Sequence, residues 1–448
     1  MSQSLNREKL LSLFDENQQG VIYLKGAEVM YRYGTDYEFP FRQESNFWYL
    51  TGVNEPEYHA VIEIKTGDYY LFSPKRDAQF AVWHGKIRGQ DEIRGHYQPD
   101  HLHFSHELLS VLRTLQPEQI YCLDEAQAEY LEDLSREFNV DTETLADAIT
   151  YCRSIKTEAE LEFMREAAGI NNLAHLEAMK ALRPGMYEYE MKALFEYHQM
   201  RHGLLQNAYS GIHAGGTNSA ILHYTDNNQP IRDGDLYLID AGFEYQGYAS
   251  DVTRTYPANG RFTGDQAAVY QTVLNALNRC IELVKPGVKM EELHLAACRI
   301  ILTGLMEMDL VRGELEEMME VNLFALFFPH GLGHFLGLDT HDVGGYPKGV
   351  ERIDRPGIRF LRVRRELEAG MVITIEPGLY FIPALLRPAL LNSEQARFLN
   401  GKKIEGLFGF GGVRIEDNLV VTETGYENLT DVPKEIREIE KVMGLSKA

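Results

Sequence analysis

The sequence contains little cysteine and little tryptophan. Its 448 residues include four cysteines, at positions 122, 152, 280 and 298, and only two tryptophans. None of the cysteines belongs to a CxxC pair, and four are too few to staple a chain of this length into a disulfide scaffold. This usage is typical of a reducing compartment, so we expect a cytoplasmic protein.

Long hydrophobic runs and an excess of positive charge are also missing. No apolar run reaches the roughly 18–20 residues that a membrane-spanning helix needs. The first residues, Met1 to Asn6, lack a basic region and an apolar core, so we expect no secretory signal. The 44 basic residues are outnumbered by 67 acidic ones, which gives a formal net charge of −23. We therefore expect neither a membrane nor a nucleic acid as partner, but the net charge does not argue against divalent cations.

The chain is long enough for two domains, because 448 residues exceed what one hydrophobic core usually serves. Residues 1–150 have the pattern of a small α/β domain, and residues 151–448 form the second domain. In the first, no catalytic cluster is visible, and Trp83 fits a half-buried surface aromatic as well as a recognition role. Its expected elements are strands at 20–24, 60–64, 68–72 and 120–123 and a helix at 108–115.

The second domain is predicted to begin with helices and to contain two internal repeats. Thr157 to Glu160 is a capping-box pattern, and the apolar residues after it follow helical spacing. A Pro-Gly turn at 184–185 recurs at 286–287, and the segment 234–240 recurs at 370–376. Both copies of the latter are a glycine turn, an apolar strand and a carboxylate. The repeats predict two related halves that each contribute an acid to one shared site.

A histidine-rich stretch, Phe328 to Asp342, is the most unusual segment. It holds His330, His334 and His341, three of the 15 histidines, among glycines and large apolar side chains. Imidazoles on a backbone that glycine allows to bend sharply suit a buried polar site. The alternative is a glycine-rich loop with incidental core histidines, and this stretch alone leaves both interpretations open.

Three acids lie on apolar strands elsewhere in the second domain. Asp240 and Glu376 end the two repeated strands, and Glu416 lies on a further apolar strand after a glycine-rich turn. A lone carboxylate in such a strand costs free energy unless it is paired or bound to a cation. These acids therefore favour a functional interpretation of the histidine-rich stretch.

A fourth acid, Asp251, follows a hairpin pattern at 244–247 that would place it beside Asp240. The alternative for Asp251 is an ion pair with Arg254. Asp417, next to Glu416, should face away from the other acids because successive strand residues point to opposite faces.

Four buried carboxylates would not remain ionised together without counter-charge. Two divalent cations, with one imidazole completing the shell, would provide it. An oxygen-rich shell with a single histidine favours Mn²⁺, which we expect, over Zn²⁺, although Co²⁺, Fe²⁺ and Zn²⁺ also fit. Such a pair of ions can deprotonate a bridging water and polarise a carbonyl, which predicts hydrolase chemistry.

At these residues the chain resembles the pita-bread metallopeptidases, the group of methionine aminopeptidase, aminopeptidase P and prolidase. The family's ligand order of Asp, Asp, His, Glu, Glu matches Asp240, Asp251, His334, Glu376 and Glu416 without a gap. The likeness runs through the whole chain. It is closest to the prolidase branch in Phe41 to Ser45, His330 to Gly345, Glu351 to Asp354 and Gly409 to Glu416.

The resemblance implies an overall α/β (α+β) architecture in two domains. The small N-terminal α/β domain would serve oligomerisation and access to the site. The C-terminal pita-bread domain would place two pseudo-twofold halves around a curved antiparallel sheet. Homodimers are common in the family, so a homodimer is expected.

The resemblance also implies a reaction and roles for the metal ligands. Asp240 and Asp251 would share one metal, Asp251 and Glu416 would bridge the two ions, and His334 and Glu376 would complete the other. Glu376 would also help to move a proton of the water. The implied reaction is hydrolysis of small Xaa-Pro peptides, dipeptides above all, by attack of a bridging water on the carbonyl before proline.

Further residues are implied to act on the substrate. His223 would stabilise the tetrahedral intermediate, His341 would touch the substrate near the proline, and Arg414 would lie beside the ligands. Arg362 would receive the C-terminal carboxylate of the dipeptide. Tyr209 would line the pocket, and Trp83 would reach the site of a neighbouring subunit.

Some of these residues have a simpler interpretation. His223 and His330 could be supporting or packing groups, and for His330, also a candidate for substrate binding, packing is the favoured one. Arg362 belongs to a cluster of six arginines between positions 352 and 365, most of which we expect to be solvated surface charges.

The runner-up function is that of an aminopeptidase P, which trims longer Xaa-Pro peptides. A pita-bread binding protein that has lost catalysis and a creatinase-like, metal-free enzyme are disfavoured, because the chain retains all five ligand residues.

Overall fold

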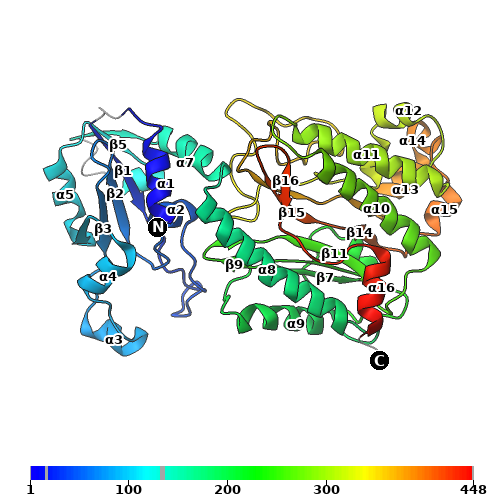
Figure 1. Ribbon diagram of the computed structural model, residues 1–448, viewed down its shortest axis with the longest axis horizontal. Coiled ribbons are helices and arrows are strands. Elements are labelled where there is room, and N and C mark those ends of the chain that lie inside the picture. Colours follow the sequence, from blue (N-terminus) through cyan, green and yellow to red (C-terminus); the bar gives the residue numbers. More distant parts are fainter. Residues whose placement is uncertain (1, 16–18, 132–136, 446–448) are drawn as a thin grey trace. The chain divides into compact units, whose positions relative to one another are not determined.

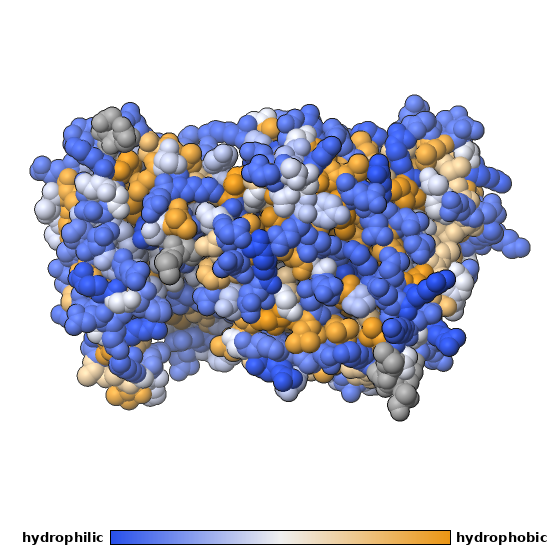
Figure 2. Space-filling view, viewed as in Figure 1, coloured by the Kyte–Doolittle hydropathy of each residue, from blue (hydrophilic) through white to orange (hydrophobic). Residues whose placement is uncertain are grey.

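A computed structural model describes residues 2–15, 19–131 and 137–445. The chain divides into two compact units, Met1–Arg153 and Ser154–Ala448, and each contains helices and strands (Figure 1). No helix within the described ranges is long and apolar enough to cross a membrane. The four cysteines are buried, free thiols. Hydrophilic residues cover most of the face shown in Figure 2.

The N-terminal unit is built on a mixed sheet of six strands in the order β4-β3-β2-β1-β5-β6. β2 pairs antiparallel with β1 and β3, and β4, β5 and β6 join through parallel pairings. The hairpin between β2 and β3 turns at Gly67, whose φ of +78° suits glycine. The expected strands are therefore confirmed. They are β1 Gly20–Lys25, β2 His59–Glu63, β3 Tyr69–Ser73, β4 His101–Phe104, β5 Gln119–Tyr121 and β6 Asn139–Asp141.

The predicted helix at 108–115 is α5, and it packs on this sheet. Its Leu108 and Leu112, four residues apart on one helix face, share a buried cluster with Val21 and Val61 of the sheet. The helices of this unit are α1 Ser2–Leu11, α2 Ser45–Thr51, α3 Ala78–His84, α4 Gln90–Tyr97, the 3₁₀ turn η1 Ser105–Glu107, α5 Leu108–Leu115, α6 Glu125–Glu129 and α7 Thr144–Ser154.

Both tryptophans of the chain lie in the N-terminal unit. Trp48 of α2 is buried, whereas Trp83 of α3 is 76% exposed. α3 buries none of its residues, and Figure 2 shows hydrophobic side chains gathered at its position. Trp83 is thus more exposed than the half-buried aromatic that one interpretation of the sequence allowed.

The C-terminal unit contains two consecutive pairs of long helices, α8 with α9 and α10 with α11, which pack against each other within each pair. The capping box predicted at Thr157 begins α8, and a second one at Thr263 begins α10. The helices of this unit are α8 Glu158–Ala181, α9 Glu188–Arg201, η2 Gly216–Ala220, α10 Gly264–Leu283, α11 Met290–Glu307, α12 Leu315–Glu320, η3 Leu323–Leu326, α13 Pro383–Leu391, α14 Ser393–Ala396, α15 Gly401–Glu405 and α16 Ile436–Leu445.

The strands of the C-terminal unit form small sheets, and neighbouring strands in each sheet run antiparallel. β8 lies between β7 and β11, β15 lies between β12 and β16, and β13 pairs with β14. The long helices cover these strands (Figure 1). The strands are β7 Ile212–Gly215, β8 Leu236–Ala241, β9 Glu244–Tyr245, β10 Tyr248–Ala249, β11 Val252–Pro257, β12 Val372–Ile375, β13 Gly378–Tyr380, β14 Gly412–Arg414, β15 Asp417–Val421 and β16 Tyr426–Asn428.

The internal repeats of the sequence correspond to repeated structure. In the first half, the N–H of Gly185 donates to the carbonyl of Ile231 at 2.8 Å, and in the second half the N–H of Gly287 donates to the carbonyl of Leu367 at 2.8 Å. The two acceptors are separated by the same 136 residues as the two strand-end acids. Each half is thus a helix pair joined by a Pro-Gly turn, followed by a strand that ends in a carboxylate.

A buried ion pair links the two halves. Arg254 of β11 and Asp417 of β15 lie 2.8 Å apart, and both side chains are fully buried. Arg254 therefore pairs with Asp417 and not with Asp251, which overturns the alternative considered for Asp251. It also confirms that Asp417 faces away from Glu416.

Replacing Asp417 tests how much this ion pair contributes to the stability of the fold. We expect Asp417→Asn to lower the free energy of unfolding by about 3–5 kcal/mol, because the buried guanidinium of Arg254 would lose its carboxylate. A matched control is Glu427→Gln, which breaks the half-exposed pair with Arg165 and should cost less than about 1 kcal/mol. Urea unfolding followed by circular dichroism measures both, and equal losses would contradict the prediction.

Candidate active site

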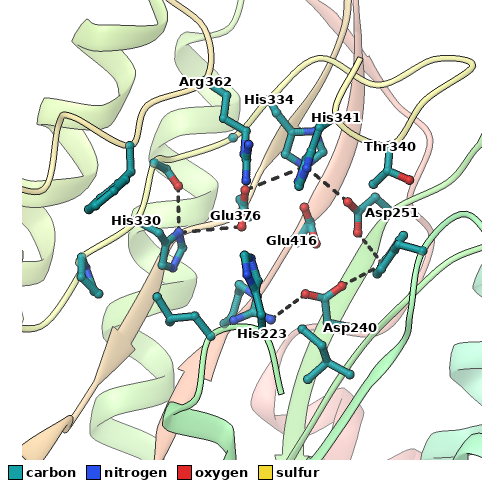
Figure 3. Close-up of a pocket in the computed structure, with 18 of the residues that line it drawn as sticks. His223, Asp240, Asp251, His330, His334, Thr340, His341, Arg362, Glu376 and Glu416 are labelled. Atoms are coloured by element: carbon teal, nitrogen blue, oxygen red, sulfur yellow. Dashed lines mark hydrogen bonds and ion pairs between the residues drawn. The ribbon is translucent and has the colours of Figure 1, made fainter. Parts of the chain in front are cut away.

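A cavity of about 650 Å³ lies in the C-terminal unit. Eleven of the twelve residues singled out from the sequence line it, and the twelfth, Trp83, belongs to the N-terminal unit. Apolar side chains, among them Leu222, Phe360 and Leu385, form another part of the wall. Figure 3 shows the acids and histidines facing one another across this space.

The first pair of acids is brought together by a hairpin. The chain turns at Gln246 and Gly247, which both have positive φ, so that β11 returns beside β8. Asp240 lies on β8, and Asp251 directly precedes β11. The hydroxyl of Tyr209 lies 2.7 Å from Oδ1 of Asp240 and 2.5 Å from Oδ1 of Asp251. Both acids therefore face one point, as the hairpin pattern predicted.

The second half adds Glu376, Glu416 and His334. Glu376 follows β12, Glu416 lies between β14 and β15, and both face the cavity (Figure 3). Nε2 of His334 lies 3.3 Å from Oδ2 of Asp251 and 3.9 Å from Oε1 of Glu376. One ligand atom each of Asp251, His334 and Glu416 lie within 4.8 Å of one another. The five predicted ligands thus converge from both halves.

Burial dominates the electrostatics of these acids. It raises the pKa of Glu376 to about 7 and that of Glu416 well above its usual value, and neighbouring acids raise the latter further. Burial also raises the pKa of Asp240, although Arg414 opposes the shift. For Asp251, burial raises the pKa, but the hydrogen bonds with His334 and Tyr209 and the charge of His334 together outweigh burial, so the pKa is lowered. The protein's own cations thus stabilise only part of the negative charge.

The donor set fits divalent cations. Nδ1 of His334 lies 2.9 Å from the carbonyl oxygen of Phe335, which can only accept, so Nδ1 carries a hydrogen. Nε2, the nitrogen that faces the acids, is therefore the one that could bind a cation once it has lost its proton. Four carboxylates with one such imidazole form an oxygen-rich shell of the kind that suits Mn²⁺.

Arg414 orients two of the acids through hydrogen bonds. Its Nη2 donates to Oδ2 of Asp240 at 2.5 Å, its Nη1 to the hydroxyl of Tyr380 at 2.9 Å, and its Nε to Oγ1 of Thr253 at 3.3 Å. The Thr253 hydroxyl in turn donates to Oε2 of Glu416 at 2.8 Å. Arg414 thus lies beside Asp240 and Glu416, as the family resemblance implied.

Tyr380 and Thr253 were missed by the sequence analysis. Thr253 is two residues beyond Asp251, so strand alternation places it on the same face and could have identified it. Tyr380 carries no such signal, because its contact with Arg414 depends on the pairing of β13 with β14.

His330 lines the cavity and also contacts groups that lie behind the cavity wall. Its Nε2 lies 2.9 Å from the hydroxyl of Tyr380, its Nδ1 lies 2.8 Å from the carbonyl of Gly331, and Oε2 of Glu376 is 3.8 Å away. Burial lowers the pKa of His330 to about 3, so the ring is neutral at ordinary pH. Its contacts are compatible with both interpretations made from the sequence.

His223, His341 and Arg362 surround the acids (Figure 3). The ring of His341 meets that of His334 edge to face, with centroids 4.5 Å apart. Arg362 points its side chain toward the space around Glu376 (Figure 3). Among the ion pairs of the described residues, none involves Arg362, so its charge is available to a ligand.

None of the six arginines of the 352–365 cluster is buried, which agrees with the surface location expected from the sequence. Some of them also bond neighbouring groups. Arg352 donates to the carbonyls of Arg359 and Leu361 at 3.1 and 3.0 Å. Arg355 donates to Asn322 at 2.8 Å, and Arg364 bonds the carbonyl of Glu351. These contacts form because an irregular segment leaves backbone carbonyls that guanidinium groups can satisfy.

Two family models match the chain. The metallopeptidase family M24 matches residues 162–423, and the aminopeptidase P N-terminal domain matches residues 4–121. The chain belongs to metallopeptidase family M24. It is therefore an enzyme of the metallopeptidase class, and the family implied by its ligand motif is confirmed.

Individual relatives cover nearly the whole chain. A Xaa-Pro dipeptidase of Rattus norvegicus is 43% identical over 99% of this chain and 94% of its own length. A probable Xaa-Pro aminopeptidase of Botryotinia fuckeliana is 37% identical over 96% of this chain and 93% of its own length. Zinc-substituted aminopeptidase P of E. coli in complex with product superposes with a TM-score of 0.85 at 34% identity, covering 100% of this chain and 98% of that one.

The donor set can be tested by metal binding. Asp251→Asn should weaken Mn²⁺ binding by more than about 100-fold, because the residue stands at the centre of the cluster. Asp226→Asn, which changes an exposed acid that does not line the cavity, should bind as the unaltered protein does. Calorimetric titration gives affinity and stoichiometry, and circular dichroism checks that both variants are folded. Unchanged binding by Asp251→Asn would exclude this residue as a ligand.

Proposed function

We propose that this metallopeptidase hydrolyses Xaa-Pro dipeptides with two divalent ions, Mn²⁺ by preference. The observation that carries the proposal is the convergence of four carboxylates, three of them buried, and His334 on one cavity beside the unpaired Arg362. The names of the relatives, Xaa-Pro dipeptidase and Xaa-Pro aminopeptidase, agree with it. An inactive binding protein would have no need of this donor set.

The metal ligands would be Asp240, Asp251, His334, Glu376 and Glu416, with Asp251 and Glu416 shared between the ions. When bound, the ions supply Lewis acidity, which activates a water and polarises the carbonyl before proline. The central place of Asp251, between Tyr209 and His334, supports its assignment as a shared ligand.

The chain's own residues provide the proton transfer and the charge stabilisation. Glu376 faces the cavity with a raised pKa, which suits a group that accepts a proton from water and returns it to the leaving nitrogen. His223 would donate a hydrogen bond to the oxygen that becomes negative at the tetrahedral carbon. His341, beside His334, would contact the substrate near its proline.

Proline substrates explain the need for a charge clamp. The nitrogen of an Xaa-Pro bond carries no hydrogen, so it cannot donate a hydrogen bond to the enzyme. A guanidinium can instead hold the free carboxylate of the proline with two hydrogen bonds. Arg362 lines the cavity without an ionic partner and would fill this role, so it would also limit the substrate to two residues.

We propose a cytoplasmic homodimer in which the N-terminal unit serves oligomerisation and Trp83 approaches a neighbouring site. The 76% exposure of Trp83 on a helix with no buried residue supports a contact with another molecule.

The role of Arg362 predicts a selective loss. Arg362→Ala should raise the KM for Gly-Pro by about 10- to 100-fold, because a charge-assisted clamp is lost, and should alter cleavage of the amide Gly-Pro-NH2 much less. Arg359→Ala is the control, since Arg359 is exposed and does not line the cavity. Steady-state kinetics with both substrates decide, and equal losses on dipeptide and amide would refute the clamp.

Substrate length separates this proposal from its runner-up. An aminopeptidase P, the function of the structural neighbour from E. coli, would cleave Gly-Pro-Ala better than Gly-Pro. We expect the reverse, because the carboxylate of the tripeptide lies one residue too far from the ions to reach Arg362. Release of glycine from the two peptides by the Mn²⁺-loaded protein measures the preference.

A further inference from the structure

A buried carboxylate outside the cavity, that of Glu188 at the start of α9, is surrounded by hydrogen-bond donors. The side chain is fully buried. Its Oε1 accepts from the N–H of Gly215 at 2.8 Å and from Nδ2 of Asn218 at 2.9 Å. Its Oε2 accepts from the hydroxyl of Tyr224 at 2.7 Å and from the N–H of Gln229 at 2.8 Å. Four donors thus compensate one buried charge.

All four donors belong to one segment, the connection of residues 215–229 between β7 and β8. Glu188 holds this segment at its first residue, in its middle and at its end. The same segment carries Leu222, His223 and Thr225 to the cavity wall. Tyr224, which is buried and bonded to Glu188, directly follows His223, which faces the cavity (Figure 3). Through its bond to Tyr224, the carboxylate of Glu188 therefore holds the backbone next to His223.

The second half of the unit lacks this device. Position 188 corresponds to Met290, which has no charge and whose Cε packs close to Gly333. The corresponding connection there, which carries Arg362, is held by other groups: Tyr346 and Arg352 both donate to the carbonyl of Leu361, at 2.6 and 3.0 Å. The repeated fold does not itself require a carboxylate at this point, so Glu188 serves something particular to the first half.

We propose that Glu188 is a positioning residue that fixes the 215–229 segment and thereby aims His223 at the reacting carbonyl. The proposal rests on the proposed function, in which His223 stabilises the developing negative charge. Since donors that stabilise such a charge act within a few tenths of an ångström, a loosened segment should lower the rate more than substrate binding.

The test is a double-mutant cycle in the Mn²⁺-loaded, full-length protein. Glu188→Gln keeps the shape but turns one acceptor into an amide that faces two donors. It should lower kcat for Gly-Pro by about 10- to 100-fold with little change of KM. In a His223→Ala background the same change should lower kcat by less than about twofold, because the group that Glu188 aims is gone. An equal loss in both backgrounds would overturn the proposal.

Tyr224→Phe provides a milder version of the cycle should Glu188→Gln fail to fold, because it removes one donor and no volume. Its matched control is Tyr248→Phe. Tyr248 is also buried and donates to a buried carboxylate, Oε1 of Glu160, at 2.9 Å, but neither residue lines the cavity. Tyr224→Phe should show the same non-additivity with His223→Ala, whereas Tyr248→Phe should leave kcat unchanged in both backgrounds.

Amide hydrogen exchange separates this inference from the proposed function. Glu188→Gln should raise exchange in peptides that span 215–229 while β8 and β11 remain protected. Unchanged exchange there would overturn the inference alone. Failure of the unaltered, metal-loaded protein to cleave Gly-Pro would instead overturn the proposed function, and the exchange result would still show whether Glu188 holds the segment.

Discussion

Repulsion among four carboxylates in one cavity is the constraint on which the catalytic unit depends. Asp240, Asp251 and Glu416 are buried and Glu376 is partly buried, and burial is the largest of the causes that bring the pKa of Glu376 to about 7. The chain offsets part of this with Arg414, which bonds Asp240, and with the hydroxyls of Tyr209 and Thr253. These groups orient the oxygens without neutralising them all. The remaining negative charge suits a site for divalent cations.

The duplicated fold explains how acids so far apart in the chain meet. In each half, a helix pair closed by a Pro-Gly turn fixes where the next strand begins, through equivalent hydrogen bonds to Ile231 and Leu367. The strand then ends in a carboxylate at the same place in each half. The connections before these strands differ in length and content. One carries His223 and the other carries Arg362, so the halves share a scaffold but supply different chemistry.

Much of this arrangement could be predicted from the sequence, because its signals are local. An acid at the end of an apolar strand costs too much to be incidental, which identified Asp240 and Glu376. Strand alternation correctly separated Glu416 from Asp417. The family resemblance supplied the ligand order. The structure then places these residues around one cavity.

Other features could not be predicted, because they depend on contacts between distant segments. The partner of Arg254 is Asp417, 163 residues later, and no local pattern distinguishes it from Asp251. Tyr380 reaches Arg414 only through the pairing of β13 with β14. Glu188 is an ordinary first-turn acid in the sequence, and only its four donors show that it anchors a segment of the site.

The placement of the tryptophans allows the N-terminal unit to be observed separately by fluorescence. Trp48 and Trp83 both belong to the N-terminal unit, one buried and one open to solvent, whereas the catalytic unit has tyrosine as its only strong ultraviolet chromophore. Fluorescence excited at wavelengths that tyrosine does not absorb therefore originates in residues 1–153 alone. A change in that emission when a peptide enters the cavity would therefore come from Trp48 or Trp83, as the proposed approach of Trp83 to the site of a neighbouring subunit would produce.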